Sequence, residues 1–230
     1  MDVEQEPLTV SQLSLFDFDD FTTGLVELFP TVWAAAENLT AQEPRQRLQA
    51  LEILDKCGAI RLSPLIAYLV FTRLTDPDLE VRKRVVQALS DVLSIDQTGK
   101  RAPDAVRQQL VSQLMRMRTR EIYALLQLLS SAAQMLPVVS RLLLGNPYAG
   151  NHLAELATQR KMPLEIRRQA IRLIGEVGYL DAIPTLERMQ MRLEARASGQ
   201  QAMPFAPPGG VDDLELLTDV KYVLLRLRSL

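Results

Sequence analysis

Cys57 and His152 are the single cysteine and the single histidine of the chain, so they are its candidates for a nucleophile and its base. A thiol is activated when an imidazole lies within hydrogen-bond distance of it. The two residues fall on predicted helices that are far apart, so we expect Cys57 to be a small buried residue near a helix end and His152 a surface or capping group. One cysteine and one histidine also exclude the usual zinc sites. We therefore expect no enzymatic activity, no cofactor and no metal.

Basic side chains that could bind an anionic partner are concentrated between residues 82 and 120, which contain nine basic residues and only three acidic ones. If they line one groove, a phosphate backbone or an acidic protein could bind there through salt-sensitive contacts. Few aromatic residues accompany them, so base stacking is unsupported. The alternative is a solvated face of long helices. The candidate patch consists of Lys83, Arg84, Arg116, Arg118 and Arg120.

Acidic side chains dominate the start of the chain. Residues 1–44 hold nine acids and no Lys or Arg, which leaves 19 acids against all 26 bases in residues 45–230. This split predicts an acidic, flexible arm over residues 1–22 that could fold over the basic groove and be displaced by a partner. The first residues are acidic and lack the basic and apolar regions of a signal peptide, and no apolar run reaches the roughly 18 residues that span a membrane. We expect a cytoplasmic protein with no membrane partner.

Apolar residues recur at helical spacing along most of the chain, and no run alternates as a strand does, so the sequence predicts an all-α fold. Residues 79–92 align without gaps on residues 164–177, and residues 47–58 align in part on 167–178. The offset of the first pair predicts a degenerate unit between them. Five helices are expected to start near residues 44, 77, 119, 163 and 212. Their partner helices are expected near residues 30–40, which Trp33 should anchor, 63–74, 104–117, 147–160 and 181–197.

The two strongest repeats resemble the HEAT-repeat family. The resemblance rests on residues 76–82, followed by Val85, Ala88 and Leu89, and on residues 163–177, followed by 181–186. It covers about residues 30–230. It implies an armadillo-like, right-handed α-solenoid of about five two-helix repeats over residues 23–230. Residues 199–211 are rich in Gly and Pro, which predicts a mobile loop inserted in the last repeat or, alternatively, a binding lip.

In three of the repeats, one arginine falls inside the apolar arc of its helix. Arg47, Arg82 and Arg167 occupy equivalent positions, and a buried guanidinium needs a carboxylate or carbonyl partner. Asp78 lies one helical turn before Arg82 and is the expected partner. The family resemblance implies a ladder of such Asp and Arg residues between repeats. Tyr123 replaces the arginine in the middle repeat, so an interruption is expected there.

A short peptide in the acidic arm resembles the bacterial sliding-clamp-binding motif, whose common form is Gln, Leu, Ser or Asp, Leu, Phe. All five positions match, in Gln12, Leu13, Ser14, Leu15 and Phe16. The resemblance implies that the leucine and the phenylalanine enter an apolar cleft on the clamp. The alternative is that the same apolar side chains, with Phe21, cap the first repeat.

These observations predict a non-enzymatic scaffold or adaptor that binds a protein along a groove, as a monomer or a weak dimer through its last helix. The first alternative is a replication or repair accessory protein that is tethered to the clamp and touches DNA. The second comes from family resemblance alone, since some HEAT-like proteins are bilin lyases and others are DNA alkylpurine glycosylases. The chain shows no distinctive bilin motif and no convincing cluster of tryptophan and carboxylate around a basic cleft.

Overall fold

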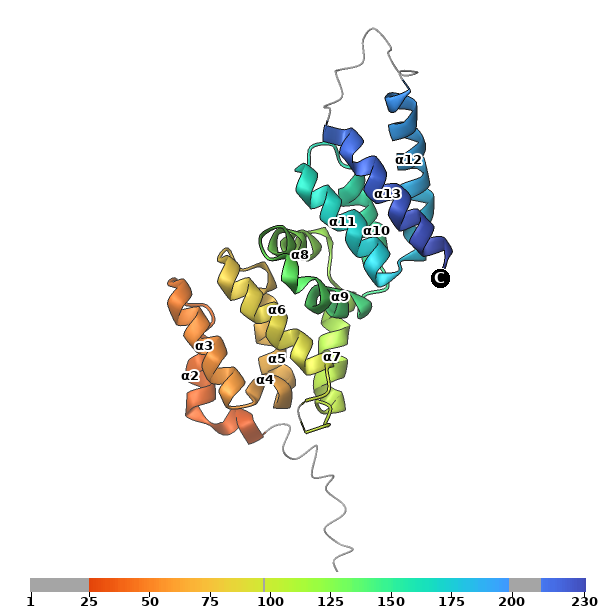
Figure 1. Ribbon diagram of the computed structural model, residues 1–230. Coiled ribbons are helices and arrows are strands. Elements are labelled where there is room, and N and C mark those ends of the chain that lie inside the picture. Colours follow the sequence, from red (N-terminus) through yellow and green to blue (C-terminus); the bar gives the residue numbers. More distant parts are fainter. Residues whose placement is uncertain (1–24, 97, 199–211) are drawn as a thin grey trace, which may run out of the picture.

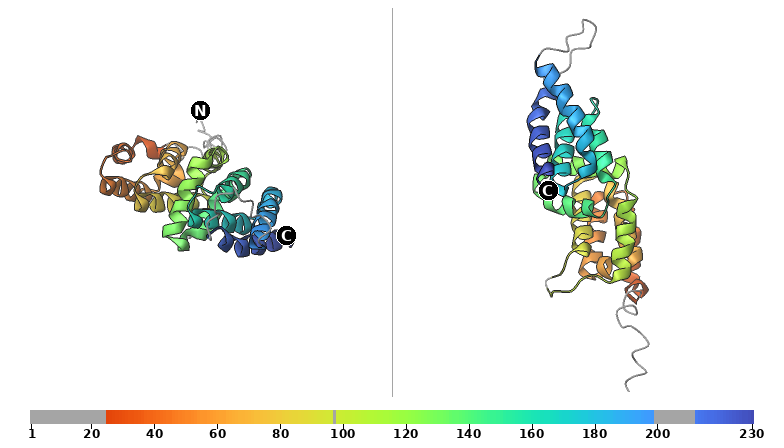
Figure 2. Two further views of the ribbon diagram at one scale, coloured as in Figure 1. Left: turned by 90° about the horizontal axis from the view of Figure 1, so that it is seen from above. Right: turned by 90° about the vertical axis from the view of Figure 1, so that its right-hand side faces the viewer.

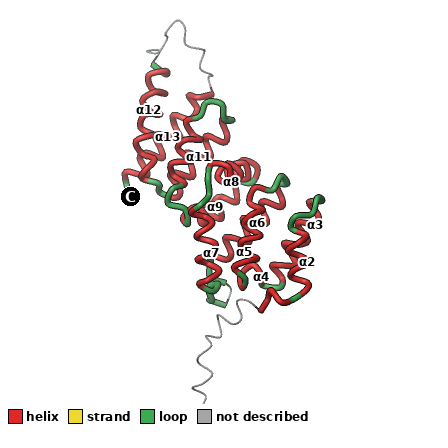
Figure 3. Tube along the Cα trace, turned by 180° about the vertical axis from the view of Figure 1, so that it is seen from behind, coloured by secondary structure: helices red, strands yellow, loops and turns green. Residues whose placement is uncertain are grey.

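The described part of the chain is helical throughout (Figures 1 and 3). A computed structural model describes residues 25–96, 98–198 and 212–230, and within them there are twelve α-helices, four short 3-10 helices and no strand. The α-helices are α2 (Pro30–Asn38), α3 (Pro44–Lys56), α4 (Ala59–Leu62), α5 (Pro64–Phe71), α6 (Leu79–Leu93), α7 (Asp104–Met115), α8 (Thr119–Ser131), α9 (Leu136–Leu144), α10 (Ala149–Thr158), α11 (Leu164–Val177), α12 (Ile183–Ala197) and α13 (Asp212–Arg228). The 3-10 helices are η2 (Val26–Leu28), η3 (Thr72–Thr75), η4 (Ala133–Met135) and η5 (Leu180–Ala182). The all-α prediction is confirmed.

The ten helices expected from the periodicity are all present, with starts within about two residues of those predicted. Proline explains several of the starts, because a first-turn proline loses no helical hydrogen bond. Pro30, Pro44 and Pro64 each open a helix in this way. Helices α4 and α9 were not predicted. The predicted acidic arm, residues 1–22, and the predicted loop, residues 199–211, lie outside the described residues.

Helices follow one another in chain order from α2 at one end of the molecule to α13 at the other (Figures 1 and 2). Neighbours in this row include α2 with α3, α3 with α6, α5 with α7, α10 with α11, and α13 with both α11 and α12. In the middle, α6 packs against α9, while α8 is seen nearly end-on in Figure 1 and contacts α10 and α11. No helix in the described residues is long and apolar enough to cross a membrane.

Helix α6 shows why the apolar positions of the repeat recur. Val81, Val85, Leu89 and Val92 are fully buried, and so is Val86 on the neighbouring arc. Burial of each of these side chains contributes about 1.5–3 kcal/mol relative to leaving it exposed. Since α3 and α9 pack against different sides of α6, one helix needs two apolar flanks.

Two glycines end equivalent helices. Gly58 follows α3 with φ 67°, and Gly178 follows α11 with φ 87°. Left-handed backbone at a helix end favours glycine, which has no Cβ to clash. The two glycines occupy matching positions in the alignment of residues 47–58 on 167–178, so the internal similarity extends to backbone conformation.

Two predicted burials are wrong. Trp33 is 42% exposed on α2, because the buried face of that helix is formed by Val32, Ala35 and Ala36. Cys57 is exposed as the C-cap residue of α3, directly before the left-handed Gly58.

Candidate partner-binding surface

Arg47 is a buried arginine of α3 that bonds to the segment just ahead of α6. Its Nη2 lies 2.7 Å from Oδ1 of Asp76, and both side chains are at most 7% exposed. Its Nη1 donates to the carbonyls of Ala41 and Gln42, each at 2.8 Å. The charge is therefore neutralised, and most of the fork is hydrogen-bonded.

The other two aligned arginines also reach forward along the chain. Arg82 of α6 donates from Nη1 to the carbonyl of Ala124, at 3.2 Å, and to Oε1 of Gln127, at 3.0 Å, both on α8. Arg167 of α11 donates to the carbonyl of Ala157, at 2.9 Å, and pairs with Asp213 of α13. In each case one buried guanidinium joins consecutive parts of the helix row.

Asp78 does not serve as the partner of Arg82. Its Oδ1 accepts from the backbone N–H of Val81 at 3.0 Å, so the carboxylate caps α6. Asp78 has extended backbone as the N-cap residue, which directs its side chain to the exposed N–H groups of the first turn. Arg82 instead turns to α8. The acids that do pair with the aligned arginines are Asp76 and Asp213, which sequence reasoning missed.

Asp213 is the centre of the last of these contacts. Besides Arg167, it binds Nη1 of Arg196 through Oδ2 at 2.9 Å. Burial alone would raise the pKa of this carboxyl, but the hydrogen bond and charge of Arg167, followed by those of Arg196, lower it below 3.8.

Tyr123, which replaces the arginine on α8, is half-buried against the core.

The structure divides the predicted basic patch. Arg84 lies 2.6 Å from Asp55 of α3, and Lys83 lies 3.5 Å from Glu80 on its own helix. Arg84 therefore faces α3, whereas Arg82, which is two residues earlier, faces α8. Such neutralised pairs attract an anionic partner weakly.

Arg116, Arg118 and Arg120 form the other part of the predicted patch, at the turn between α7 and α8. All three are exposed, and none has a carboxylate partner among the residues that the structure describes. Arg120 reaches back to Oγ1 of Thr75 at 3.4 Å, next to the start of α6. Uncompensated positive charge is therefore concentrated at this turn.

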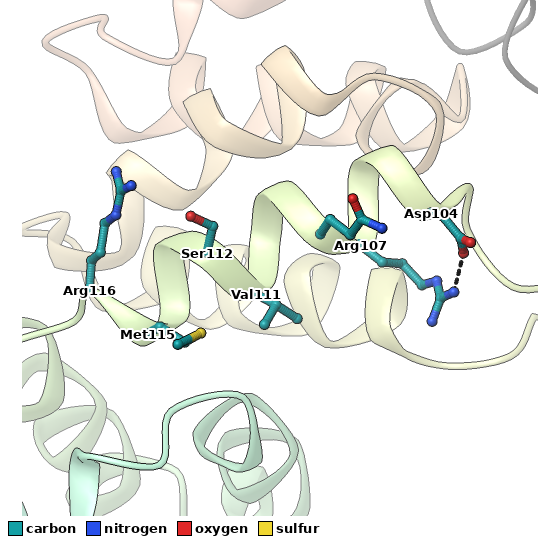
Figure 4. A pocket seen from close by; sticks show the side chains of 7 residues that line it. Asp104, Arg107, Val111, Ser112, Met115 and Arg116 are labelled. Atoms are coloured by element: carbon teal, nitrogen blue, oxygen red, sulfur yellow. Dashed lines mark hydrogen bonds and ion pairs between the residues drawn. The ribbon is translucent and has the colours of Figure 1, made fainter.

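A hollow of about 610 Å³ runs along α7 and ends at Arg116. Figure 4 shows an Asp104–Arg107 ion pair at one end, Arg116 at the other, and Val111, Ser112 and Met115 between them. Met115 is 45% exposed although it is a large apolar side chain. We call this row, lined also by Gln108, the α7 surface.

Sequence reasoning included Arg116 but missed the apolar centre of the α7 surface. Arg107, Val111 and Met115 recur at a spacing of four, which places them on one side of a helix. The same spacing is also typical of a core face, so exposure had to come from the fold. The buried side of the helix, rotated from this row by about 100°, is formed by Val106, Leu110 and Leu114.

Cys57 and His152 do not meet. Cys57 ends α3 near the start of the helix row, whereas His152 lies on α10 in the other half (Figure 1). The Nδ1 of His152 is 3.1 Å from Oγ1 of Thr119, a residue in the first turn of α8. The described residues contain no group of three or more His, Cys, Asp or Glu side chains that could hold a metal ion.

The clamp-like peptide, residues 12–16, lies outside the described residues. Comparisons of the chain with protein-family models, with curated proteins and with solved structures found no match.

Proposed function

We propose that the protein is a non-enzymatic scaffold, built as a HEAT-like α-solenoid, that binds a protein partner on the α7 surface. The observation that carries the proposal is the exposed Met115 next to the half-buried Val111, between charged side chains. An apolar centre with a charged rim is typical of protein interfaces.

Three features support the solenoid architecture. The helices follow one another in a row, Arg47, Arg82 and Arg167 each bond to the next part of that row, and glycine ends two equivalent helices. A row of stacked helix pairs offers an elongated surface, which suits a scaffold better than a deep cavity would.

The charge next to the α7 surface favours an acidic partner. Arg116, Arg118 and Arg120 lie at one end of it without carboxylate partners in the described part of the chain. Helix α5, which packs against α7, exposes Leu65 and Tyr68. The preferred partner is therefore a protein segment that combines apolar side chains with Asp or Glu.

The proposal is tested by affinity capture from a bacterial lysate, followed by binding measurements with each purified captured protein. The variant replaces Val111 and Met115 with Glu. The matched control replaces Met191 and Leu225 with Glu, because these side chains are 61% and 72% exposed on other helices. We expect a partner that the α7 variant loses and the control retains. If every captured protein binds both variants equally well, the α7 surface is not the binding site.

The pentapeptide Gln12 to Phe16 supports a second candidate function, tethering to the bacterial sliding clamp. In that case the scaffold would act at replication or repair sites, with DNA as a further partner of its basic residues. The test is fluorescence anisotropy of the full chain with a purified bacterial clamp. A variant with Leu15→Ala and Phe16→Ala should lose binding, and Leu8→Ala, in the same arm, should retain it. Equal binding by all three proteins would exclude the motif.

A further inference from the structure

A pocket between the end of α10 and α12 has two arginines among its lining residues. Its volume is about 270 Å³, and it is lined by Thr158, Thr185, Arg188, Met189 and Arg192. Arg188 donates to Oγ1 of Thr185 at 3.1 Å and to the carbonyl of Pro184 at 3.2 Å, so its guanidinium is held beside the pocket. We call this site the arginine pocket.

Helix α12 separates its charges onto two sides. Its acids Glu187 and Glu194 pair with cations of α13, Arg228 at 2.7 Å and Lys221 at 2.8 Å. At 100° per residue, Arg188, Arg192 and Arg196 share the opposite side of the helix. The acids of α12 are therefore already paired with cations of α13, and they lie away from the arginine pocket.

Arg192 has no hydrogen-bond or ion-pair partner among the described residues, although its side chain is partly buried. Asp213, whose negative charge acts on Arg192, is already bound by Arg167 and Arg196. Burial lowers the pKa of Arg192, and the neighbouring positive charges add to this effect. The largest of these charge effects on the pKa comes from Arg160, followed by Arg196 and then Arg167. Several guanidinium groups therefore share one carboxylate.

We propose that the arginine pocket binds a phosphate monoester group. Guanidinium groups present planar pairs of N–H donors that match the oxygens of a phosphate. A phosphate monoester carries about 1.5 to 2 negative charges at pH 7. It supplies to Arg192 and Arg188 the negative charge that the described residues do not provide.

The size and composition of the pocket favour a monoester over other anions. A carboxylate carries a single charge, whereas Arg188, Arg192 and nearby Arg160 are three cations without a carboxylate of their own in the described part of the chain. A nucleic-acid strand presents one charge per phosphate and needs a long basic track, with aromatic side chains for its bases. The lining contains no aromatic residue among the described ones.

The test is isothermal titration calorimetry of the full chain at constant ionic strength. The probes are inorganic phosphate, O-phosphoserine, a short phosphoserine peptide with its unphosphorylated twin, and an oligothymidylate of similar length. We expect saturable binding of phosphate and O-phosphoserine, and none of the unphosphorylated peptide. Tighter binding of the phosphopeptide than of free O-phosphoserine would identify a protein as the source of the group, and equal binding would identify a small molecule. Both results support the proposal.

Variants connect the binding to the arginine pocket. Arg192→Gln should raise the dissociation constant for O-phosphoserine at least tenfold. Arg45→Gln, which removes the same charge from an exposed position on α3, should leave it unchanged. Thr185→Asp places a carboxylate in the pocket without removing an arginine and should also prevent binding. Circular dichroism of each variant checks that it is folded.

Three outcomes would overturn the proposal. The first is that phosphate shows no saturable binding at concentrations up to about 10 mM, because a dissociation constant above this value corresponds to very weak binding. The second is an equal loss of binding in Arg192→Gln and Arg45→Gln, which would indicate general attraction to a positive surface. The third is oligothymidylate binding as tight as that of the monoester and equally sensitive to Arg192→Gln.

Discussion

Arg47 and Asp76 form a buried ion pair that joins α3 to the segment ahead of α6, with 2.7 Å between Nη2 and Oδ1. Oδ1 also accepts from the backbone N–H of Asp78 at 2.9 Å, and Asp78 in turn caps α6. One carboxylate thus connects the arginine of one helix with the loop that starts the next. This contact couples the stacking of α3 and α6 to the local conformation of residues 76–78.

Replacement of Asp76 by Ala leaves the Arg47 guanidinium buried without a counter-charge. The free energy of unfolding should fall by about 3–5 kcal/mol, as expected when one partner of a buried pair is removed. Urea unfolding followed by circular dichroism measures this change. Asp104→Ala is the control, because Asp104 pairs with Arg107 at the surface and its loss should cost about 1 kcal/mol or less. Similar losses in both variants would contradict the role of the buried pair.

The helix row was largely predictable because periodicity and proline placement are local signals. Helix α9 was missed because Leu136–Leu144 is short and mostly apolar, which does not distinguish a helix from a buried connection. The partners of the aligned arginines were less predictable. Asp76 and Asp78 lie in one loop, and only the backbone conformation decides which one caps α6 and which one pairs with Arg47.

The functional surfaces depend on distances that a sequence does not contain. The arginine pocket is lined by residues of α10 and α12, and the positive charges of Arg160 and Arg167 act on Arg192 from two further segments. Exposure of Met115 likewise depends on which side of α7 faces its neighbours. Apolar spacing predicted helices, but it did not distinguish a core face from an exposed row.

The contact between Asp213 and Arg167 should make stability depend on pH. Because the folded-state pKa of Asp213 is lower than the unfolded value of about 3.9, the carboxylate stabilises the fold above that pH. The contribution is lost as the pH falls through the folded-state pKa. Asp213→Asn should therefore be less stable than the wild type at pH 7, and the difference should shrink below about pH 3.9. Thermal unfolding of both proteins between pH 7 and 3 measures this, and a constant difference would argue against it.

Gly150 of α10 lies where a side chain has no space. A Cβ at this position would lie 2.5 Å from Oδ1 of Asp181 and 2.8 Å from Cβ of Tyr179. Gly150→Ala should destabilise the protein by about 1–3 kcal/mol, although alanine usually favours a helix. Asn151→Ala, at the next and exposed position of the same helix, is the control and should change stability little. Differential scanning calorimetry compares the unfolding temperatures of the two variants. If Gly150→Ala unfolds at the same temperature as the wild type, α10 and η5 move apart readily enough to fit the added methyl group.

Because like charges surround Arg192 at the arginine pocket, its replacement should increase stability, and the increase should depend on salt. Arg192 is partly buried among like charges, so Arg192→Gln should raise the free energy of unfolding at low salt and in the absence of phosphate, by less than about 1 kcal/mol. The gain should decrease at 1 M salt, because the Debye length falls from about 10 Å at 0.1 M to about 3 Å. Arg196→Gln should have the opposite effect, since it removes a 2.9 Å contact with Asp213. Urea unfolding at the two salt concentrations separates the variants. A loss of stability in Arg192→Gln that does not depend on salt would mean that Arg192 is held by contacts within the protein, and that no anion is needed to balance its charge.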